Sequence, residues 1–164
     1  MLIMGIDPGT ATTGYAFVRE DEDGAPQAVA YGVITTPPST PMPQRLQHIY
    51  AEVKRLIAEH QPEEAAIEEM FFGKNITAAI TVAQGRGVTL MALADARLKI
   101  REYKPAEVKQ TVAGSGNAPK KQVQEMVKTL LNLDHIPKPD DAADALAIAI
   151  TALQSSRWEH LVGE

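Results

Sequence analysis

The sequence predicts an α/β fold with a five-stranded mixed sheet flanked by helices. Three strand-like segments follow one another directly in residues 1–35, which is typical of a meander. From residue 44 onward, helix-like and strand-like segments alternate. A length of 164 residues suggests one domain, and a composition that is 45% hydrophobic can form a substantial core. We therefore expect a single domain over residues 1–164, with the last eight residues forming a flexible tail.

The first three strands follow from apolar or alternating runs that end in turn residues. An apolar run leads into Asp7-Pro8-Gly9-Thr10, so a buried strand enters a tight turn. The next run alternates around Tyr15, Phe17 and β-branched residues, and an acidic, glycine-containing turn separates it from the third. Four prolines in residues 37–43 then mark a stiff connector that cannot lie within a sheet. The expected strands are residues 2–6, 13–19 and 27–35.

The second half of the chain is mainly helical in pattern. Apolar residues from Leu46 to Ile57 recur at three- and four-residue steps, which indicates an amphipathic helix. Pro105 suits the first position of a helix, and residues 114–117 read as a flexible loop. The remaining expected elements are a helix over 44–60, a strand over 65–68, a helix over 76–94, a strand over 98–103, and helices over 105–112, 119–131 and 140–153.

Composition excludes several classes of protein. Without cysteine, the chain has no disulfide framework, thiolate zinc site or cysteine nucleophile, which fits a reducing cytoplasm. No uninterrupted apolar run reaches the roughly 18 residues of a membrane span, and the N-terminus has no secretory signal. We therefore expect a cytoplasmic protein with no membrane partner.

The net charge of −5 is unevenly distributed. Taken alone, it argues against a nucleic acid partner, because an acidic surface repels phosphate. Residues 71–131, however, contain ten basic and four acidic residues, a balance of +6, and the rest of the chain carries −11. A basic half that binds phosphates and an acidic site that needs metal are therefore compatible with DNA binding, which should weaken steeply with salt.

Four acidic residues stand out by their position. Asp7 and Glu68 end predicted buried strands, and Asp141 and Asp144 lie three apart on one face of the last helix. If that helix packs against the sheet end, the four carboxylates converge and require cations. Oxygen ligands without cysteine suit Mg²⁺ or Mn²⁺, and two such ions can clamp both oxygens of a phosphodiester cleavage.

Each of these acids also has a purely structural interpretation. Asp7 before Pro-Gly is a good turn residue, and Asp141 or Asp144 alone could cap a helix or balance its dipole. Glu68 has no obvious structural task at the end of its strand. Spacing alone does not establish that the four converge.

Several strings, in order along nearly the whole chain, resemble the RuvC family of bacterial Holliday-junction resolvases. The resemblance is carried by Gly5-Ile6-Asp7-Pro8-Gly9-Thr10 with Thr13-Gly14-Tyr15, by Ala66-Ile67-Glu68-Glu69-Met70-Phe71 with Lys74-Asn75, by Gln84-Gly85-Arg86-Gly87-Val88, by Val108-Lys109-Gln110-Thr111-Val112, and by Asp141-Ala142-Ala143-Asp144-Ala145-Leu146-Ala147-Ile148-Ala149.

This resemblance implies a ribonuclease-H-like fold and a homodimer that nicks two opposing strands of a four-way DNA junction. The four catalytic and metal-binding acids fall on Asp7, Glu68, Asp141 and Asp144. It further implies two Mg²⁺ ions per site, with Mn²⁺ as a substitute, and products with 5′-phosphate and 3′-hydroxyl ends. A role in homologous recombination and DNA repair, coupled to the RuvA–RuvB branch-migration complex, is implied as well. Asp140 and Glu69 are extra acids whose register needs checking.

The resemblance also implies DNA contacts. The family's aromatic residue beside the junction centre maps to Phe71, whose alternative place is the core; Phe72 makes this assignment ambiguous. The basic candidates for DNA contact are Lys74, Arg86, Lys109, Lys120 and Lys121. For the lysines the alternative is a solvated helix face, and for Arg86 a surface charge on the dimer helix. Which lysine acts in the chemistry is left open.

The predicted helix over 76–94 is apolar on more than one face. Such a helix must be buried on two sides, one against the sheet and the other against a partner. Gly85 and Gly87 would allow close approach, and the alternative is a helix wholly inside the core.

Three rival functions remain. An actin-like or sugar-kinase ATPase opens with a similar loop but needs two subdomains, which 164 residues cannot hold. Another nuclease of the same fold, acting on an RNA–DNA hybrid or other structured DNA, would carry the same four acids. A non-catalytic junction-binding protein would have no need of an intact acid set.

Overall fold

The computed structural model of the chain describes residues 1–70 and 73–163. A five-stranded mixed sheet forms its centre, with strands in the order β3-β2-β1-β4-β5. The first three strands pair antiparallel, whereas β1, β4 and β5 run parallel. The elements are β1 (Leu2–Asp7), β2 (Thr12–Glu20), β3 (Pro26–Thr35), α1 (Met42–His60), β4 (Glu64–Glu68), α2 (Ile76–Asp95), β5 (Lys99–Tyr103), α3 (Pro105–Ala113), α4 (Lys120–Leu130) and α5 (Asp140–Val162).

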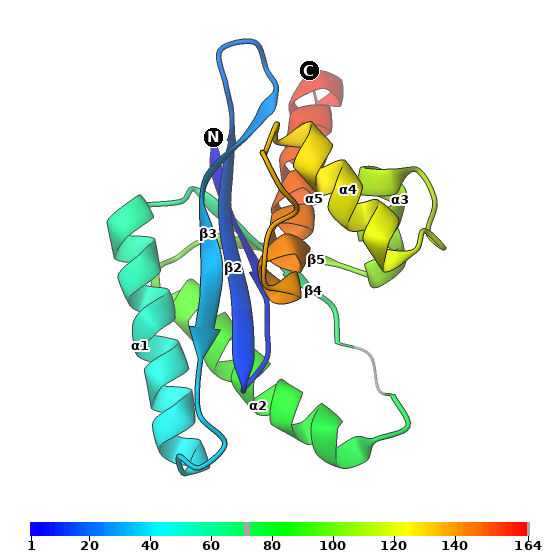
Figure 1. Cartoon of the computed structure of the whole chain (residues 1–164). Coiled ribbons are helices and arrows are strands. Elements are labelled where there is room, and N and C mark those ends of the chain that lie inside the picture. The colour runs from blue at the N-terminus through cyan, green and yellow to red at the C-terminus, as the bar shows by residue number, and fades with distance from the viewer. Residues whose placement is uncertain (71–72, 164) are drawn as a thin grey trace.

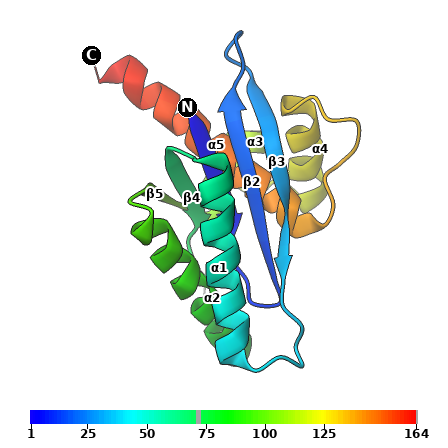
Figure 2. The ribbon, with the colours of Figure 1, turned by 90° about the vertical axis from the view of Figure 1, so that its left-hand side faces the viewer.

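Helices cover both faces of the sheet (Figures 1 and 2). Helices α1 and α2 lie on one face, and α5, with α3 and α4 outside it, lies on the other. Each face has its own core: Met4, Ile6 and Phe17 pack with α1 and α2, while Ile3 and Val18 pack with α5. This alternation along β1 and β2 is the period-two pattern of strands buried on both faces. The predicted fold class is confirmed.

The predicted elements all occur, and the last helix is longer than predicted. Helix α5 ends at Val162 rather than at Leu153, because no glycine or proline interrupts it before Gly163. Residues 157–162, which belong to the segment expected as a flexible tail, continue this helix.

Helix α2 is buried on one side only. Gly85, Thr89, Ala92 and Leu93 are buried against the rest of the chain, whereas an apolar face is exposed. That face consists of Ile76, Ile80 and Met91, whereas Val82 lies on the side of the helix that carries Gly85 and Thr89. The alternative of a helix wholly inside the core is therefore wrong for this chain. Among the described residues, α2 is also the helix whose length and composition would suffice to cross a membrane, although its longest uninterrupted apolar run covers only residues 90–94.

Candidate active site

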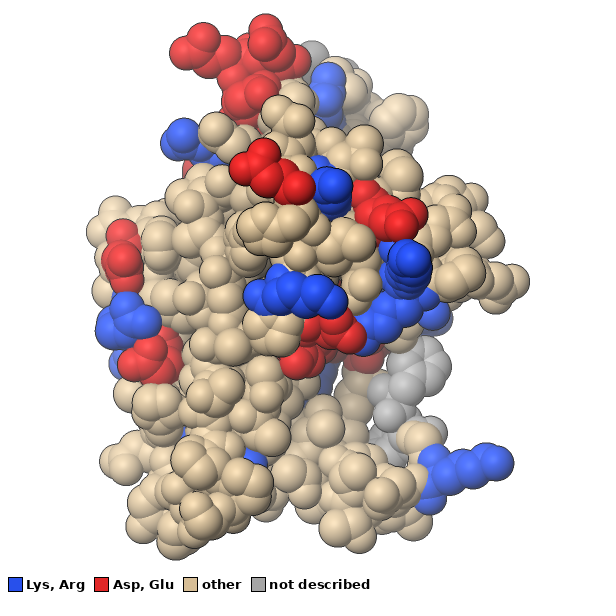
Figure 3. All heavy atoms as spheres, in the orientation of Figure 1, with Lys and Arg blue, Asp and Glu red and all other residues tan. Residues whose placement is uncertain are grey.

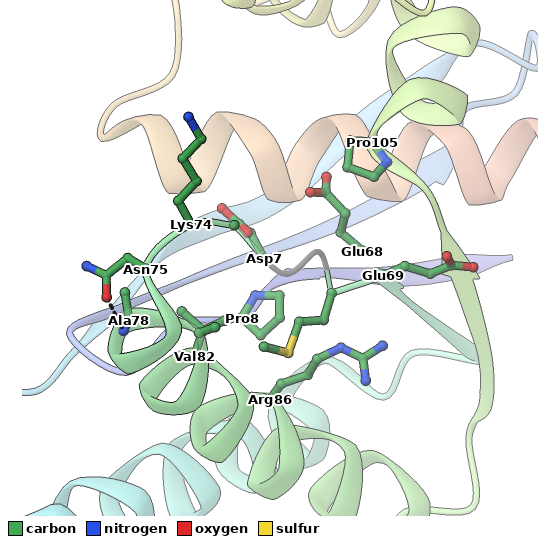
Figure 4. A pocket seen from close by; sticks show the side chains of 13 residues that line it. Asp7, Pro8, Glu68, Glu69, Lys74, Asn75, Ala78, Val82, Arg86 and Pro105 are labelled. Carbon is green, nitrogen blue, oxygen red and sulfur yellow. Dashed lines mark hydrogen bonds between the residues drawn. The ribbon is translucent and has the colours of Figure 1, made fainter.

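Strand alternation directs two of the predicted acids toward helix α5. In β1, Ile3 faces α5 and Met4 faces the opposite layer, so Asp7, four residues after Ile3, points to the α5 side. In β4, Ala66 belongs to the α5 core, and Glu68 follows it by two residues. Since β1 and β4 are parallel neighbours, the two carboxylates emerge at the same edge of the sheet. Figure 4 shows both pointing the same way.

Two glycines let helix α5 lie directly on the sheet. A Cβ atom on Gly14 of β2 would clash with the carbonyl oxygen of Asp141, and one on Gly5 of β1 would clash with that of Ala145. The first turns of α5 therefore contact the strands backbone to backbone. This close approach brings the side chains of Asp141 and Asp144 within reach of Asp7.

Three carboxylates converge at this point. Oxygen atoms of Asp7, Asp141 and Asp144 all lie within 4.8 Å of one another. Burial, followed by repulsion from Asp144, Asp141 and Glu68, raises the pKa of Asp7 from 3.8 to about 8. The site thus concentrates negative charge that only protons or cations can balance.

Glu68 lies beside this cluster rather than within it. Burial raises the pKa of Glu68, repulsion from Asp144 adds to the effect, and Lys109 opposes it. Glu68 borders two cavities. The larger, of about 580 Å³, also contains Asp7, Lys74 and Arg86 in its wall, and the smaller, of about 240 Å³, is shared with Lys109, Lys120 and Asp144.

Lys120 at the start of α4 faces the acids of α5. Its Nζ lies 3.2 Å from a carboxylate oxygen of Asp140 and 4.0 Å from one of Asp144. Partial burial lowers the pKa of Lys120, but Asp140, Asp144 and Asp141 outweigh that effect and raise it. Burial raises the pKa of Asp144, and Lys120 offsets part of the rise. Lys120 is therefore a cation held at the edge of the acidic cluster.

The two extra acids lie away from the cluster. Asp140 is exposed, and its carboxylate accepts a hydrogen bond from Gln124 and pairs with Lys120. Glu69 donates its backbone N–H to the carbonyl of Tyr103, and its side chain points away from Asp7 (Figure 4). Neither Asp140 nor Glu69 belongs to the cluster formed by Asp7, Asp141 and Asp144.

The site fits a hard divalent cation. Its converging donors are all carboxylate oxygens, which are the ligands that Mg²⁺, Mn²⁺ and Ca²⁺ accept. Lys120 lies at the edge of this negative charge, and Lys109 lies close enough to Glu68 to lower its pKa. The donor set, with its mutual repulsion, is that of a divalent metal site.

On the face seen in Figure 3, Lys and Arg side chains lie above and to the right of a central group of Asp and Glu side chains. Lys74 shares the larger cavity with Glu68, and Lys109 shares the smaller one. Arg86 lies in the larger cavity but is mostly buried, and its guanidinium pairs with Glu102 at 3.2 Å. Lys121 is exposed on α4. Phe71 and Phe72 lie outside the described residues.

Two functional features were missed by reasoning from the sequence. One is the close packing at Gly5 and Gly14, which only the position of α5 reveals. The other is a buried polar group under the loop after Asp7, in which Arg45 takes part. Arg45 precedes Ile49 by four residues and Val53 by eight, so a charged residue on the apolar face of α1 was a signal in the sequence.

The chain matches the family model "Crossover junction endodeoxyribonuclease RuvC" over residues 3–152. The crossover junction endodeoxyribonuclease RuvC of Heliobacterium modesticaldum is 51% identical over 158 residues, covering 96% of this chain and 97% of that protein. The protein of the same name from Chloroflexus aggregans is 53% identical over 150 residues, covering 92% and 91%.

Solved structures agree with these matches. Thermus thermophilus RuvC in complex with Holliday junction substrate superposes with a TM-score of 0.91 at 35% identity, covering 96% of both chains. The yeast mitochondrial Holliday junction resolvase Ydc2 has a TM-score of 0.70 at 16% identity, covering 96% of this chain and 82% of that one. At 16% identity, the likeness to Ydc2 shows a shared fold alone.

Proposed function

The chain belongs to the RuvC family of crossover junction endodeoxyribonucleases, and we propose that it cuts four-way DNA junctions with the carboxylates of Asp7, Glu68, Asp141 and Asp144. Membership makes it a nuclease that hydrolyses phosphodiester bonds. The assignment of the chemistry to these four residues is carried by the convergence of Asp7, Asp141 and Asp144 within 4.8 Å, with Glu68 beside them.

The four carboxylates hold divalent metal, and Mg²⁺ is the ion we assign, with Mn²⁺ as a substitute. We assign two ions per site, because the carboxylate of Asp7 is close enough to Asp144, Asp141 and Glu68 to be repelled by all three. When bound, the ions balance charge on the phosphate and make water a stronger nucleophile. The raised pKa of Asp7 supports this role, since repulsion among its neighbours favours cation binding.

The chain's own residues hold the substrate over this site. Lys109 and Lys120 flank Glu68 and Asp144, where they can neutralise a phosphate that approaches the acids. Lys120 is the better placed of the two to stabilise charge developing on the phosphate. Lys74 and Lys121 extend the basic surface, and Arg86 contributes to DNA contact from the wall of the larger cavity. Phe71 provides the stacking contact with a junction base.

The active unit is a homodimer formed through α2. On the exposed apolar face of α2, the side chains of Ile76 and Ile80 are 71% and 55% exposed. Apolar side chains this exposed on one helix face are typical of an interface. Two copies would make paired, symmetric nicks that leave 5′-phosphate and 3′-hydroxyl ends in recombination and DNA repair.

The whole chain, residues 1–164, acts as one nuclease domain in the cytoplasm. Its work is coupled to branch migration by a RuvA–RuvB complex. The lack of cysteine is consistent with a reducing compartment.

Cleavage compared across substrates tests this function. The purified protein with Mg²⁺ is incubated with an end-labelled four-way junction, a matched duplex and an RNA–DNA hybrid. We expect symmetric nicks in the junction alone, which a ligase seals without further processing. Equal or faster cleavage of the hybrid or duplex would contradict the proposed substrate.

Asp7→Asn serves as the control for the site. It should bind the junction in EDTA as tightly as the wild type does and fail to cut it in Mg²⁺. Normal cleavage by this variant would show that the assigned carboxylates do not perform the reaction.

A further inference from the structure

A group of buried polar side chains lies under the loop that follows Asp7. The loop, residues 8–11, connects β1 to β2. Thr10, Thr36 and Arg45 are 3%, 3% and 9% exposed, and they come from the loop, the end of β3 and helix α1. Burying so many polar groups is unfavourable unless their hydrogen bonds are made. Each of the three makes at least one.

The loop backbone is held by Thr36. The N–H of Thr36 donates to the carbonyl of Ala11 at 3.0 Å, and its hydroxyl donates to the carbonyl of Thr10. The hydroxyl of Thr10 in turn donates to the carbonyl of Thr81 on α2, at 2.5 Å. The loop is therefore tied to β3 on one side and to α2 on the other.

Arg45 determines the donor-to-acceptor direction of this series of hydrogen bonds. Its Nε donates to Oγ1 of Thr36 at 2.9 Å, and Nη2 lies 3.4 Å from the carbonyl oxygen of Thr36. A hydroxyl has one proton, so Oγ1 accepts from Arg45 and directs that proton to the carbonyl of Thr10. In the described part of the chain, Arg45 has no carboxylate partner, and its charge strengthens these bonds instead.

The loop also lies directly against α2. A Cβ atom on Gly85 would come within 2.6 Å of the carbonyl oxygen of Gly9 and 3.0 Å of Oγ1 of Thr10. Thr81 directly follows Ile80, which belongs to the exposed apolar face of α2. The position of the loop is thus coupled to the position of this helix.

We infer that Arg45, acting through Thr36 and Thr10, is a positioning residue for the metal site. By immobilising residues 8–11, it fixes the end of β1 and hence the direction of the Asp7 carboxylate. The inference rests on the proposed function of Asp7 as a metal ligand. Loss of the hydrogen bonds should weaken metal binding and slow cleavage while leaving junction binding intact, because none of the three residues belongs to the basic surface.

Thr36→Val tests the inference, since it keeps the shape of the side chain and removes its hydroxyl. Two Mg²⁺ midpoints are measured. The first is the Mg²⁺ concentration at which single-turnover cleavage is half-maximal. The second, measured without DNA, is the Mg²⁺ concentration at which the melting temperature has risen by half of its full Mg²⁺-induced increase. Loss of groups that orient metal ligands typically costs 10- to 100-fold, so we expect both midpoints to rise by about tenfold. Junction affinity in EDTA should stay unchanged.

Thr151→Val is the matched control. Thr151 is a buried threonine whose hydroxyl donates to the carbonyl of Ala147 within α5, at 2.8 Å, so its loss costs stability without touching the loop. Both Mg²⁺ midpoints should match the wild type in this variant. Thr36→Ser keeps the hydroxyl and should restore them. If Thr36→Val leaves both midpoints at the value of Thr151→Val, the inference is overturned.

Arg45→Lys covers the case in which Thr36→Val does not fold. It keeps the charge and the bond from Thr36 to Thr10 but loses the Nε donor, so the midpoints should rise by a smaller factor. Unchanged midpoints would overturn the inference. Asp7→Asn measured alongside separates the two claims: if it cuts normally, the proposed function fails, and if it is inactive while Thr36→Val is normal, only the positioning role fails.

Discussion

Replacing Asp7 with asparagine should stabilise the metal-free protein near neutral pH. In the folded state burial, Asp144, Asp141 and Glu68 raise the pKa of Asp7 from 3.8 to about 8. The folded protein therefore binds more protons than the unfolded chain between these two values, and its stability falls as pH rises through that window. At about 1.4 kcal/mol per pH unit, the raised pKa of Asp7 opposes folding by at most about 4 kcal/mol at pH 7, compared with a carboxyl group that keeps its ordinary pKa.

Part of this free-energy cost is shared with the neighbouring carboxylates, which adjust their positions and protonation when Asp7 is replaced. We therefore expect Asp7→Asn to gain about 1 to 3 kcal/mol at pH 7, which raises the melting temperature by about 2 to 10 °C. At pH 5, only about one unit above the unfolded value of 3.8, the same linkage amounts to less than about 2 kcal/mol, so the gain should fall to less than half of its value at pH 7.

Thermal unfolding in EDTA at pH 5 and pH 7.5 measures this difference. Glu125→Gln, which removes an exposed acid of α4, should show no such pH-dependent gain. Adding Mg²⁺ should reverse the order, because the wild type binds the ion more tightly. A variant that is destabilised at both pH values, or stabilised equally at both, would refute the electrostatic account of the site.

Four further substitutions test other parts of the account. Gly14→Ala should push the first turn of α5 off the sheet, costing about 2 kcal/mol or more of stability and at least tenfold in cleavage rate. Lys120→Met should slow cleavage by roughly 10- to 100-fold with little loss of junction affinity, whereas Lys121→Met should weaken affinity alone. Ile80→Glu should convert the dimer to a folded monomer, as measured by light scattering with circular dichroism.

For each substitution, one outcome would contradict the reasoning behind it. Gly116→Ala is the control for Gly14→Ala, because its added Cβ would meet its nearest neighbour at an ordinary 3.4 Å; equal effects of the two would discount the packing argument. Equal loss of rate in Lys120→Met and Lys121→Met would remove the special role of Lys120. If Ile80→Glu has the same molecular mass in solution as the wild-type dimer, the dimer interface does not lie on this face of α2.

The sequence was sufficient to predict the strands and the acids that end them. The ends of β1 and β4 are local features, because an apolar run stops at Asp7 and at Glu68 and the alternation sets which face each acid occupies. The helical pair Asp141 and Asp144 is likewise visible in the spacing of three. What could not be predicted was their separation, which depends on how closely α5 approaches the sheet.

That approach depends on residues far apart in the chain. The need for glycine at position 14 becomes apparent only in the folded structure, where the carbonyl of Asp141 leaves no room for a Cβ atom. The hydrogen bonds of Arg45 join α1 to β3 and the loop after β1, and no local pattern relates them. The length of α5 beyond Leu153 was underestimated for another reason, since its apolar pattern fades while its backbone continues unbroken.

Anomalous scattering from crystals grown with Mn²⁺ tests the central claim most directly. The account predicts manganese peaks within coordinating distance of Asp7, Asp141 and Asp144, with Glu68 as a further ligand, and their loss in Asp7→Asn. Manganese bound elsewhere, or bound equally well by Asp7→Asn, would contradict the assignment of these carboxylates as the metal centre of the nuclease.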